Sequence, residues 1–179
     1  LKACGLTGDW AVWAVPKIIQ ALIMVVLEWG TVRLAMDLER DGGGKGRRKR
    51  DESLPVWVLL LSMASWFGWA YGGRTLSNVA EAALAVWALC WWPIAGFEAG
   101  RYAVAILLVG MGVFLRPSSL LFWLHPLLLL LWRLQLRQWP SFLGISLTAA
   151  ILVVSAGFTL DSWLYGHGVF SWLNFAKLN

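Results

Sequence analysis

The sequence predicts an all-α membrane protein with about six transmembrane helices. Of its 179 residues, 59% are apolar and only 14% are charged, and the mean hydropathy is +0.66. These values lie far outside those of an average soluble domain. The apolar residues form long blocks separated by short charged or Pro/Gly-rich stretches, not the alternating pattern of a membrane β-barrel. We therefore expect the chain to cross the membrane as helices.

Six apolar blocks are candidates for membrane-spanning helices. A spanning helix needs about 20 mostly apolar residues, and fewer where the membrane is thin. The predicted spans cover residues 15–36, 55–73, 77–95, 101–115, 119–133 and 140–160. They make one membrane domain over residues 1–179, with a basic loop at 38–54 and a C-terminal segment at 161–179. Because the chain starts at Leu1 without an initiator Met or a targeting motif, we expect an internal segment of a longer protein.

Pro117 divides the block 101–133 into the fourth and fifth predicted spans. Proline has no N–H group, and it disfavours helix at the preceding residue, Arg116. One kinked helix over the whole block is the alternative. Two helices place Arg133 and Arg137 on the same side as the basic loop, which the positive-inside rule assigns to the cytosol. A single helix would move both arginines to the other side, so we favour six spans.

The basic loop holds six of the 15 Lys and Arg residues and, with its four acidic residues, contributes +2 to the net charge of +5. It reads LERDGGGKGRRKRDES and has no interleaved aromatic residues, so we expect contact with water and anionic lipid and not with nucleic acid. Nucleophile-elbow, Walker and HExxH motifs are absent from the sequence. With two widely separated histidines, we expect no metal site, and we predict no cofactor.

Polar residues gather on the side opposite the basic loop, which the topology makes luminal. They are Arg74, Asn78, Glu81, Arg116, Asp161, Tyr165 and His167. A charge at membrane depth costs a few kcal/mol unless it is paired or hydrated, so Arg74 or Arg116 should pair with Glu81 or Asp161. In a structural alternative, Ser77 caps a helix and Glu81 lies in its first turn. In the functional alternative, the residues line an aqueous cavity for a phosphorylated or sugar substrate, and arginine binds the phosphate.

Two further features have structural and functional interpretations. Glu28 stands alone in the first apolar block, where it is either a functional carboxylate or a helix-packing hydrogen-bond partner. The Trp pairs, WFGW and the WW at residues 91–92, lie near predicted span ends and are interpreted as interfacial anchors.

Five ordered sequence blocks carry a family resemblance. They are WAVPKIIQAL, SWFGWAYGGRTLSNVAEAAL, CWWP, LRPSSLLFWLHPL and DSWLYGHGVFSWLNFAKLN. Together they resemble the dolichyl-phosphate-mannose-dependent mannosyltransferases, which build glycosylphosphatidylinositol (GPI) anchors and N-glycan precursors. The resemblance covers nearly the whole chain except the basic loop. Ser118, Ala176 and Glu28 depart mildly from the family pattern of Thr, Leu and Asp.

This resemblance implies a GT-C fold in a multi-pass protein of the endoplasmic reticulum membrane. It implies transfer of mannose from dolichyl-phosphate mannose to a GPI-precursor glycolipid, as the third mannose in α1,2 linkage. The acidic motif of the family lies in the first luminal loop, upstream of this chain, so we expect no catalytic residue here. The expected substrate-binding residues are Arg74, Asn78, Glu81, Arg116, Asp161, Tyr165, Asn174 and Lys177.

Two other classes of protein compete with this interpretation. A mannosyltransferase of N-glycan assembly would differ in its acceptor. A multi-span transporter or lipid-binding scaffold would be expected to contain inverted repeats, and the first three and last three predicted spans show no convincing repeat. An acidic motif in a long first luminal loop upstream would distinguish the transferases from the scaffold.

Overall fold

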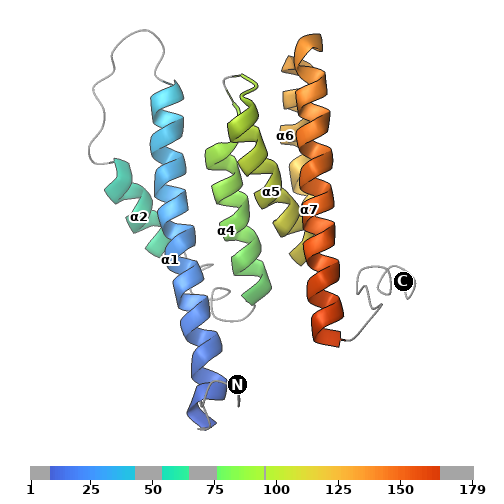
Figure 1. Ribbon diagram of the computed structural model, residues 1–179. Helices are drawn as coiled ribbons and strands as arrows, with labels where there is room; N and C mark the ends of the chain where they lie inside the picture. Colours follow the sequence, from blue (N-terminus) through green and yellow to red (C-terminus); the bar gives the residue numbers. More distant parts are fainter. Residues whose placement is uncertain (1–8, 43–53, 65–75, 95, 166–179) are drawn as a thin grey trace.

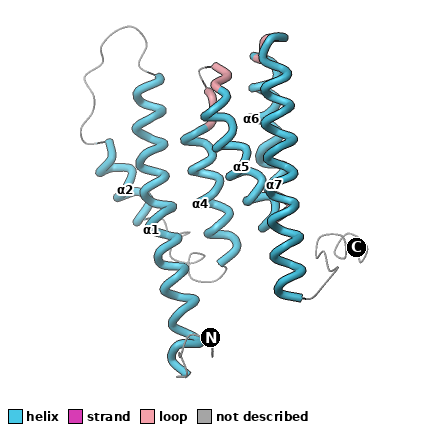
Figure 2. Tube along the Cα trace, in the orientation of Figure 1, coloured by secondary structure: helices cyan, strands magenta, loops and turns pink. Residues whose placement is uncertain are grey.

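The computed structural model describes residues 9–42, 54–64, 76–94 and 96–165 (Figure 1). Apart from short connections, these residues are helical (Figure 2), which confirms the all-α prediction for the described part of the chain. The elements are α1 (Asp9–Gly42), α2 (Leu54–Ala64), α4 (Leu76–Trp91), α5 (Ala99–Leu115), α6 (Ser119–Arg133), the short 3-10 helix η2 (Leu136–Gln138) and α7 (Trp139–Tyr165).

Successive helices run in opposite directions (Figure 1). Helix α1 packs against α2 and α4, α4 packs against α5, and α5 packs against α7. The connections at 92–98 and 134–138 lie at one end of the bundle, the upper end in Figure 1. The turn at 116–118 and the start of α4 lie at the opposite, lower end. The fold therefore separates the upper arginines Arg101 and Arg133 from the lower polar residues of α4.

Among the described residues, two helical stretches are long and apolar enough to cross a membrane. They are Ala14–Arg40 in α1 and Leu136–Leu164, which covers η2 and all but the last residue of α7. The apolar stretches of α4, α5 and α6 have 10–17 residues. At about 1.5 Å per residue, the longest of these covers roughly 26 Å, somewhat less than a hydrocarbon core of about 30 Å. The six-span arrangement therefore stays a prediction.

The surface of the bundle is rich in large apolar side chains. Leu61 is 69% exposed, Leu121 is 76% exposed and Trp132 is 87% exposed. A soluble monomer rarely exposes a continuous apolar surface of this kind, whereas lipid contact accommodates it. Helix α4, between α1 and α5, has no exposed large apolar side chain among its described residues. It is the central helix of the described bundle.

An aromatic core joins α4, α5, α6 and α7 near the upper end. The ring centroids of Trp92 and Trp123 are 5.3 Å apart, and those of Tyr102 and Phe142 are 5.1 Å apart. Tyr102 is fully buried, and its hydroxyl lies 2.8 Å from Ser146 Oγ, which donates to the Phe142 carbonyl. Trp92 is only 6% exposed. Its interpretation as an interfacial anchor was wrong, because its ring packs inside the protein.

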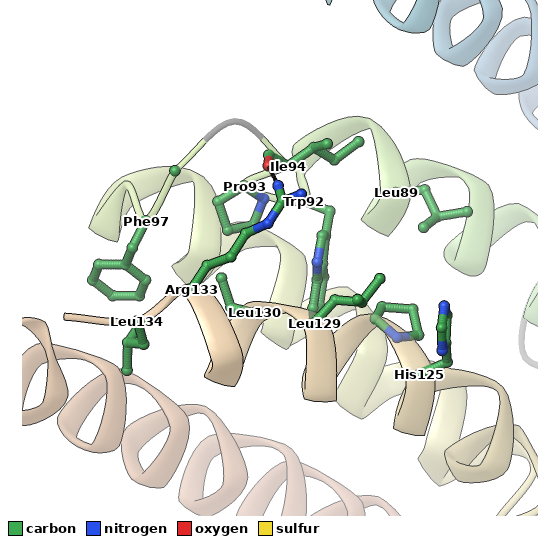
Figure 3. Close-up of a pocket in the computed structure, with 12 residues that line it drawn as sticks. Leu89, Trp92, Pro93, Ile94, Phe97, His125, Leu129, Leu130, Arg133 and Leu134 are labelled. Atoms are coloured by element: carbon green, nitrogen blue, oxygen red, sulfur yellow. Dashed lines mark hydrogen bonds between the residues drawn. The ribbon is translucent and has the colours of Figure 1, made fainter.

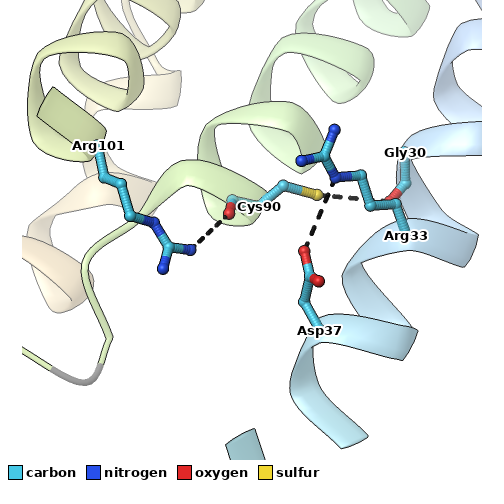
Figure 4. A network of polar contacts seen from close by, with 5 residues as sticks. All are labelled: Gly30, Arg33, Asp37, Cys90 and Arg101. Carbon is cyan, nitrogen blue, oxygen red and sulfur yellow. Dashed lines mark hydrogen bonds and ion pairs between the residues drawn. The ribbon is translucent and has the colours of Figure 1, made fainter. Parts of the chain in front are cut away.

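The contact between α1 and α4 depends on a glycine and two side-chain donors. Cys90 Sγ donates to the carbonyl of Gly30 at 3.6 Å (Figure 4). Trp87 Nε1 donates to the carbonyl of Val26 at 3.0 Å. A Cβ atom at Gly30 would lie 2.9 Å from Trp87 Nε1. The close approach of the two helices therefore requires a residue without a side chain at this position.

Arg33 adds a charged group to the same helix contact. Its guanidinium lies 5.4 Å from the ring centroid of Trp87 and 5.5 Å from that of Trp91, within the range of a cation–π interaction. Arg33 Nε lies 3.8 Å from Asp37 Oδ2, one helical turn further along α1. Arg33 therefore connects α1 to the C-terminal part of α4.

The contact between α5 and α7 also relies on glycines. A Cβ atom at Gly110 would lie 2.8 Å from Val153 Cγ2, and one at Gly157 would overlap the ring of Phe114. Small residues allow helix backbones to approach closely in membrane proteins, where no hydrophobic force between helices compensates for a loose contact. These two glycines therefore determine how near α7 lies to α5.

The helix break at Pro117 separates α5 from α6. Arg116 has an extended backbone, with φ −147° and ψ 109°, as expected for a residue that precedes proline. Its N–H still donates to the carbonyl of Gly112 at 2.9 Å, which closes the last turn of α5. Helix α6 begins at Ser119. The prediction of two helices is confirmed, and the single kinked helix is excluded.

Some helix ends differ from the predicted boundaries. Helix α1 continues to Gly42 and α7 continues to Tyr165, into segments predicted as polar loops. Hydropathy marks where a chain leaves hydrocarbon, but a helix can continue into water. Helix α4 ends at Trp91, before residue 95, because Pro93 follows two residues later. Residues 65–73 of the second predicted span lie outside the described residues.

Candidate functional site

A polar cluster at the lower end joins α5 to α4. Arg116 Nη1 donates to Asn78 Oδ1 at 2.6 Å, and the same nitrogen lies 3.2 Å from Glu81 Oε2. Asn78 and Glu81 are three residues apart, so they project from one face of α4. The pairing of Arg116 with Glu81 is one of those that the sequence predicts. We refer to Asn78, Glu81 and Arg116 as the lower cluster.

The helix break positions the arginine of this cluster. Pro117 ends α5 at Leu115, so Arg116 lies at the lower end of the bundle. Helix α4 packs directly against α5 and starts at this same end. The Arg116 side chain therefore crosses to the first two turns of α4.

The guanidinium of Arg116 retains unused donors. Its side chain is 44% exposed, and that of Glu81 is 21% exposed. Both contacts use Nη1, and Nε and Nη2 have no partner among the described residues. A guanidinium has five N–H groups in a planar fork that matches the oxygens of a phosphate or carboxylate. The lower cluster thus presents an oriented cation that can bind an oxyanion.

The helix-capping alternative does not account for Glu81. Helix α4 begins at Leu76, so Ser77 lies inside it, and its first turn contains no acidic residue. Glu81 lies in the second turn, where the effect of the helix dipole is already weak. Its carboxylate instead contacts Arg116 of the neighbouring segment.

The other predicted site residues are placed only in part. Asp161 is buried, at 7% exposure, near the C-terminal end of α7. That end lies at the lower end of the bundle, as the lower cluster does (Figure 1). Tyr165 is the last residue of α7. Arg74, Asn174 and Lys177 lie outside the described residues, as does His167.

Glu28 is separate from the lower cluster. It belongs to α1, which packs on the side of α4 opposite α5 (Figure 1). Its Oε2 atom is buried and has no hydrogen-bond partner within the described ranges. The structure therefore leaves both interpretations of Glu28 open, and it shows that Glu28 does not contribute to the Arg116 contacts.

A second feature, the upper pocket, was not predicted from the sequence. It has a volume of about 260 Å³ and lies between the connection at 92–98 and α6 (Figure 3). Its wall is mostly apolar and includes Trp92, Phe97 and Leu130, with Arg133 at one end. The sequence signal was Arg133, which the positive-inside rule interprets only as a topological charge.

Comparison with known proteins identifies the family. All residues from 1 to 179 match the Alg9-like mannosyltransferase family. The chain is 26% identical to GPI alpha-1,2-mannosyltransferase 3 of Xenopus laevis, over 99% of this chain and 32% of the relative. It is 30% identical to GPI mannosyltransferase 3 of Yarrowia lipolytica, over 100% of this chain and 33% of the relative.

The human relative agrees with these two. GPI alpha-1,2-mannosyltransferase 3 of Homo sapiens is 26% identical over 94% of this chain and 28% of its own length. No solved structure matches the chain. The chain spans about a third of the length of the curated relatives it matches. Because the family match extends over every residue and confirms the resemblance seen in the ordered sequence blocks, the chain belongs to the Alg9-like mannosyltransferase family.

Proposed function

We propose that the complete protein that includes this chain transfers mannose from dolichyl-phosphate mannose to a GPI-precursor glycolipid. The mannose is the third of the anchor and is joined in α1,2 linkage. The family match and the names of the Xenopus, Yarrowia and human relatives support this reaction. The protein acts at the luminal face of the endoplasmic reticulum membrane as a multi-pass enzyme.

The proposed topology has six membrane spans. The upper end of the bundle faces the cytosol, and the lower end faces the lumen. Support comes from the alternating helix directions and from the location of Arg101, Arg133 and the C-terminal end of α1 at the upper end. Positive charges are retained on the cytosolic side of membrane proteins. The lower cluster then faces the compartment in which the lipid-linked donor is used.

Arg116 binds the phosphate of the donor in this proposal. In the reaction, an acceptor hydroxyl forms a bond to the anomeric carbon of mannose while the bond from that carbon to the phosphate oxygen breaks. The leaving dolichyl phosphate gains one negative charge, and the hydroxyl proton passes to a base, which we place outside this chain. A preoriented cation stabilises the charge that develops on the phosphate. The orientation of Arg116 through Nη1 is the observation that supports this role.

The remaining lower-end residues supply contacts around that phosphate. Glu81 and Asn78 hold the Arg116 guanidinium and leave Nε and Nη2 directed to substrate. Arg74, Asp161, Tyr165, Asn174 and Lys177 are proposed to contact donor or glycan from the same luminal side. Their sequence positions support this arrangement, since all of them fall in or beside segments assigned to the lumen.

Complementation tests the proposed reaction. In cells that lack GPI alpha-1,2-mannosyltransferase 3, expression of the complete protein should restore surface GPI-anchored proteins, as measured by flow cytometry. Precursor glycolipids with two mannoses should be converted to the three-mannose form. Cells deficient in an N-glycan mannosyltransferase serve as the control, and their truncated lipid-linked oligosaccharide should not be extended. If the protein rescued only the cells deficient in N-glycan mannosylation, the proposed acceptor would be wrong. If it rescued neither cell line at normal abundance, mannosyl transfer would be refuted.

Glu81→Gln should lower the mannosyl-transfer rate by about tenfold, because a charge-assisted contact to Arg116 becomes a neutral one worth roughly 1.4 kcal/mol less. The rate is measured in microsomes at matched protein abundance. Glu98→Gln is the matched control, since Glu98 is exposed at the upper end. If Glu81 acts through Arg116, adding Glu81→Gln to Arg116→Ala should cause little further loss. If the double variant lost as much activity as the two single variants combined, Glu81 would not act by positioning Arg116.

A further inference from the structure

The upper pocket is a separate site from the lower cluster, at the opposite end of the bundle. Leu89, Trp92, Phe97, Leu129 and Leu130 supply most of its wall. Figure 3 shows Trp92 and Phe97 on the connection at 92–98, facing Leu129 and Leu130 on α6, with Leu89 on α4 beside them. An apolar wall of this kind offers little to a sugar or a nucleotide, whose hydroxyl groups would lose their hydrogen bonds to water.

Arg133 places one positive charge at the end of this apolar wall. Its Nη1 donates to the carbonyl of Ile94 at 2.8 Å, which holds the side chain across the pocket end (Figure 3). Nε and Nη2 of Arg133 have no partner among the residues that the structure describes. Arg133 is also the last residue of α6, so it lies where that helix reaches the proposed cytosolic membrane boundary.

The upper pocket is elongated along α6. It extends from Arg133 back to His125 on α6, a distance of about 12 Å at the usual rise per residue. Pro126 and Leu129 lie between these two residues. The pocket therefore extends from the membrane boundary into the apolar depth of the bundle.

We propose that the upper pocket binds an anionic phospholipid of the cytosolic leaflet. One acyl chain lies along the apolar wall, and the phosphate accepts hydrogen bonds from the Arg133 nitrogens that do not bind Ile94. Charge complementarity supports this occupant, because a single oriented cation at the mouth of an apolar groove matches an amphipathic anion. This inference rests on the proposed membrane topology and is independent of the proposed reaction.

Photolabelling of the complete protein in phosphatidylcholine nanodiscs tests the site. The probes are phosphatidylserine and phosphatidylcholine, each with a photoactivatable group on one acyl chain, and labelled peptides are identified by mass spectrometry. The phosphatidylserine probe should label peptides containing residues 92–97 and 125–134 about tenfold more than the phosphatidylcholine probe does. Arg133→Gln should remove this preference. Arg137→Gln should retain it, because Arg137 is exposed on η2 and does not line the pocket.

Two further variants test the apolar part of the pocket. Leu129→Trp and Ile94→Trp should each fill the groove and reduce labelling by both probes, and Ile94 is already 42% exposed, so its replacement should leave folding intact. The proposal would be overturned if the two probes labelled the protein equally and none of these variants changed the labelling. Displacement of phosphatidylserine by millimolar inorganic phosphate would also overturn it, since the site would then bind phosphate without a lipid.

Discussion

Replacement of Arg116 by alanine is expected to lower mannosyl transfer by the complete protein by about 100-fold, at unchanged abundance in the membrane. The substitution removes the cation that would stabilise charge on the leaving phosphate, and it leaves Asn78 and Glu81 without their common partner. Removal of one preorganised donor to a developing oxyanion typically has an effect of this size. The rate is measured in microsomes with labelled dolichyl-phosphate mannose.

Two controls separate this role from a structural one. Arg116→Lys keeps the positive charge but loses the planar fork, so we expect activity between those of wild type and Arg116→Ala. Arg137→Ala removes an exposed arginine at the upper end and should leave the rate unchanged. Wild-type restoration of surface GPI-anchored proteins by Arg116→Ala at normal abundance would remove Arg116 from the mechanism.

Gly157→Val should lower the free energy of unfolding by about 1–3 kcal/mol, the usual cost of overpacking a close contact. A Cβ atom at Gly157 would already overlap the ring of Phe114, and valine adds two methyl groups, so α7 must move away from α5. The change should appear as a lower melting temperature of the detergent-purified complete protein and as a lower steady-state abundance in cells.

A matched glycine in the same helix provides the control. Gly144 also belongs to α7, and a Cβ atom there would have no atom within 4 Å, so Gly144→Val should show only the small effect of helix propensity. Adding Phe114→Ala to Gly157→Val should partly restore the melting temperature, because the smaller side chain leaves space for valine. Equal melting temperatures for the two valine variants would show that the close contact does not stabilise the bundle.

Local chain chemistry made much of the helical pattern predictable. Pro117 cannot donate a hydrogen bond and forces Arg116 out of the helical region, so α5 and α6 could be separated without knowledge of their neighbours. Helix ends without such a residue were harder to predict. The continuation of α1 to Gly42 and of α7 to Tyr165 depends on backbone hydrogen bonds that polar residues can also make.

The sequence could predict which residues form the candidate site, but it could not predict the contacts between them. Opposite charges near one membrane face indicated that Arg74 or Arg116 would pair with Glu81 or Asp161. The use of a single nitrogen of Arg116 for both Asn78 and Glu81 could not be predicted, since it depends on the relative rotation and offset of α4 and α5. The upper pocket was missed for the same reason, because its wall combines residues from α4, the 92–98 connection and α6.

The sequence by itself determined that the chain is helical, where proline interrupts it, and to which family it belongs. These properties follow from residues close together in the chain or from their order along it. Only the tertiary structure decided which charges meet and which Trp is buried. It does so through packing between helices. Gly110 and Gly157 set how closely α7 approaches α5, and the packing of α4 against α5 brings Arg116 to Asn78 and Glu81.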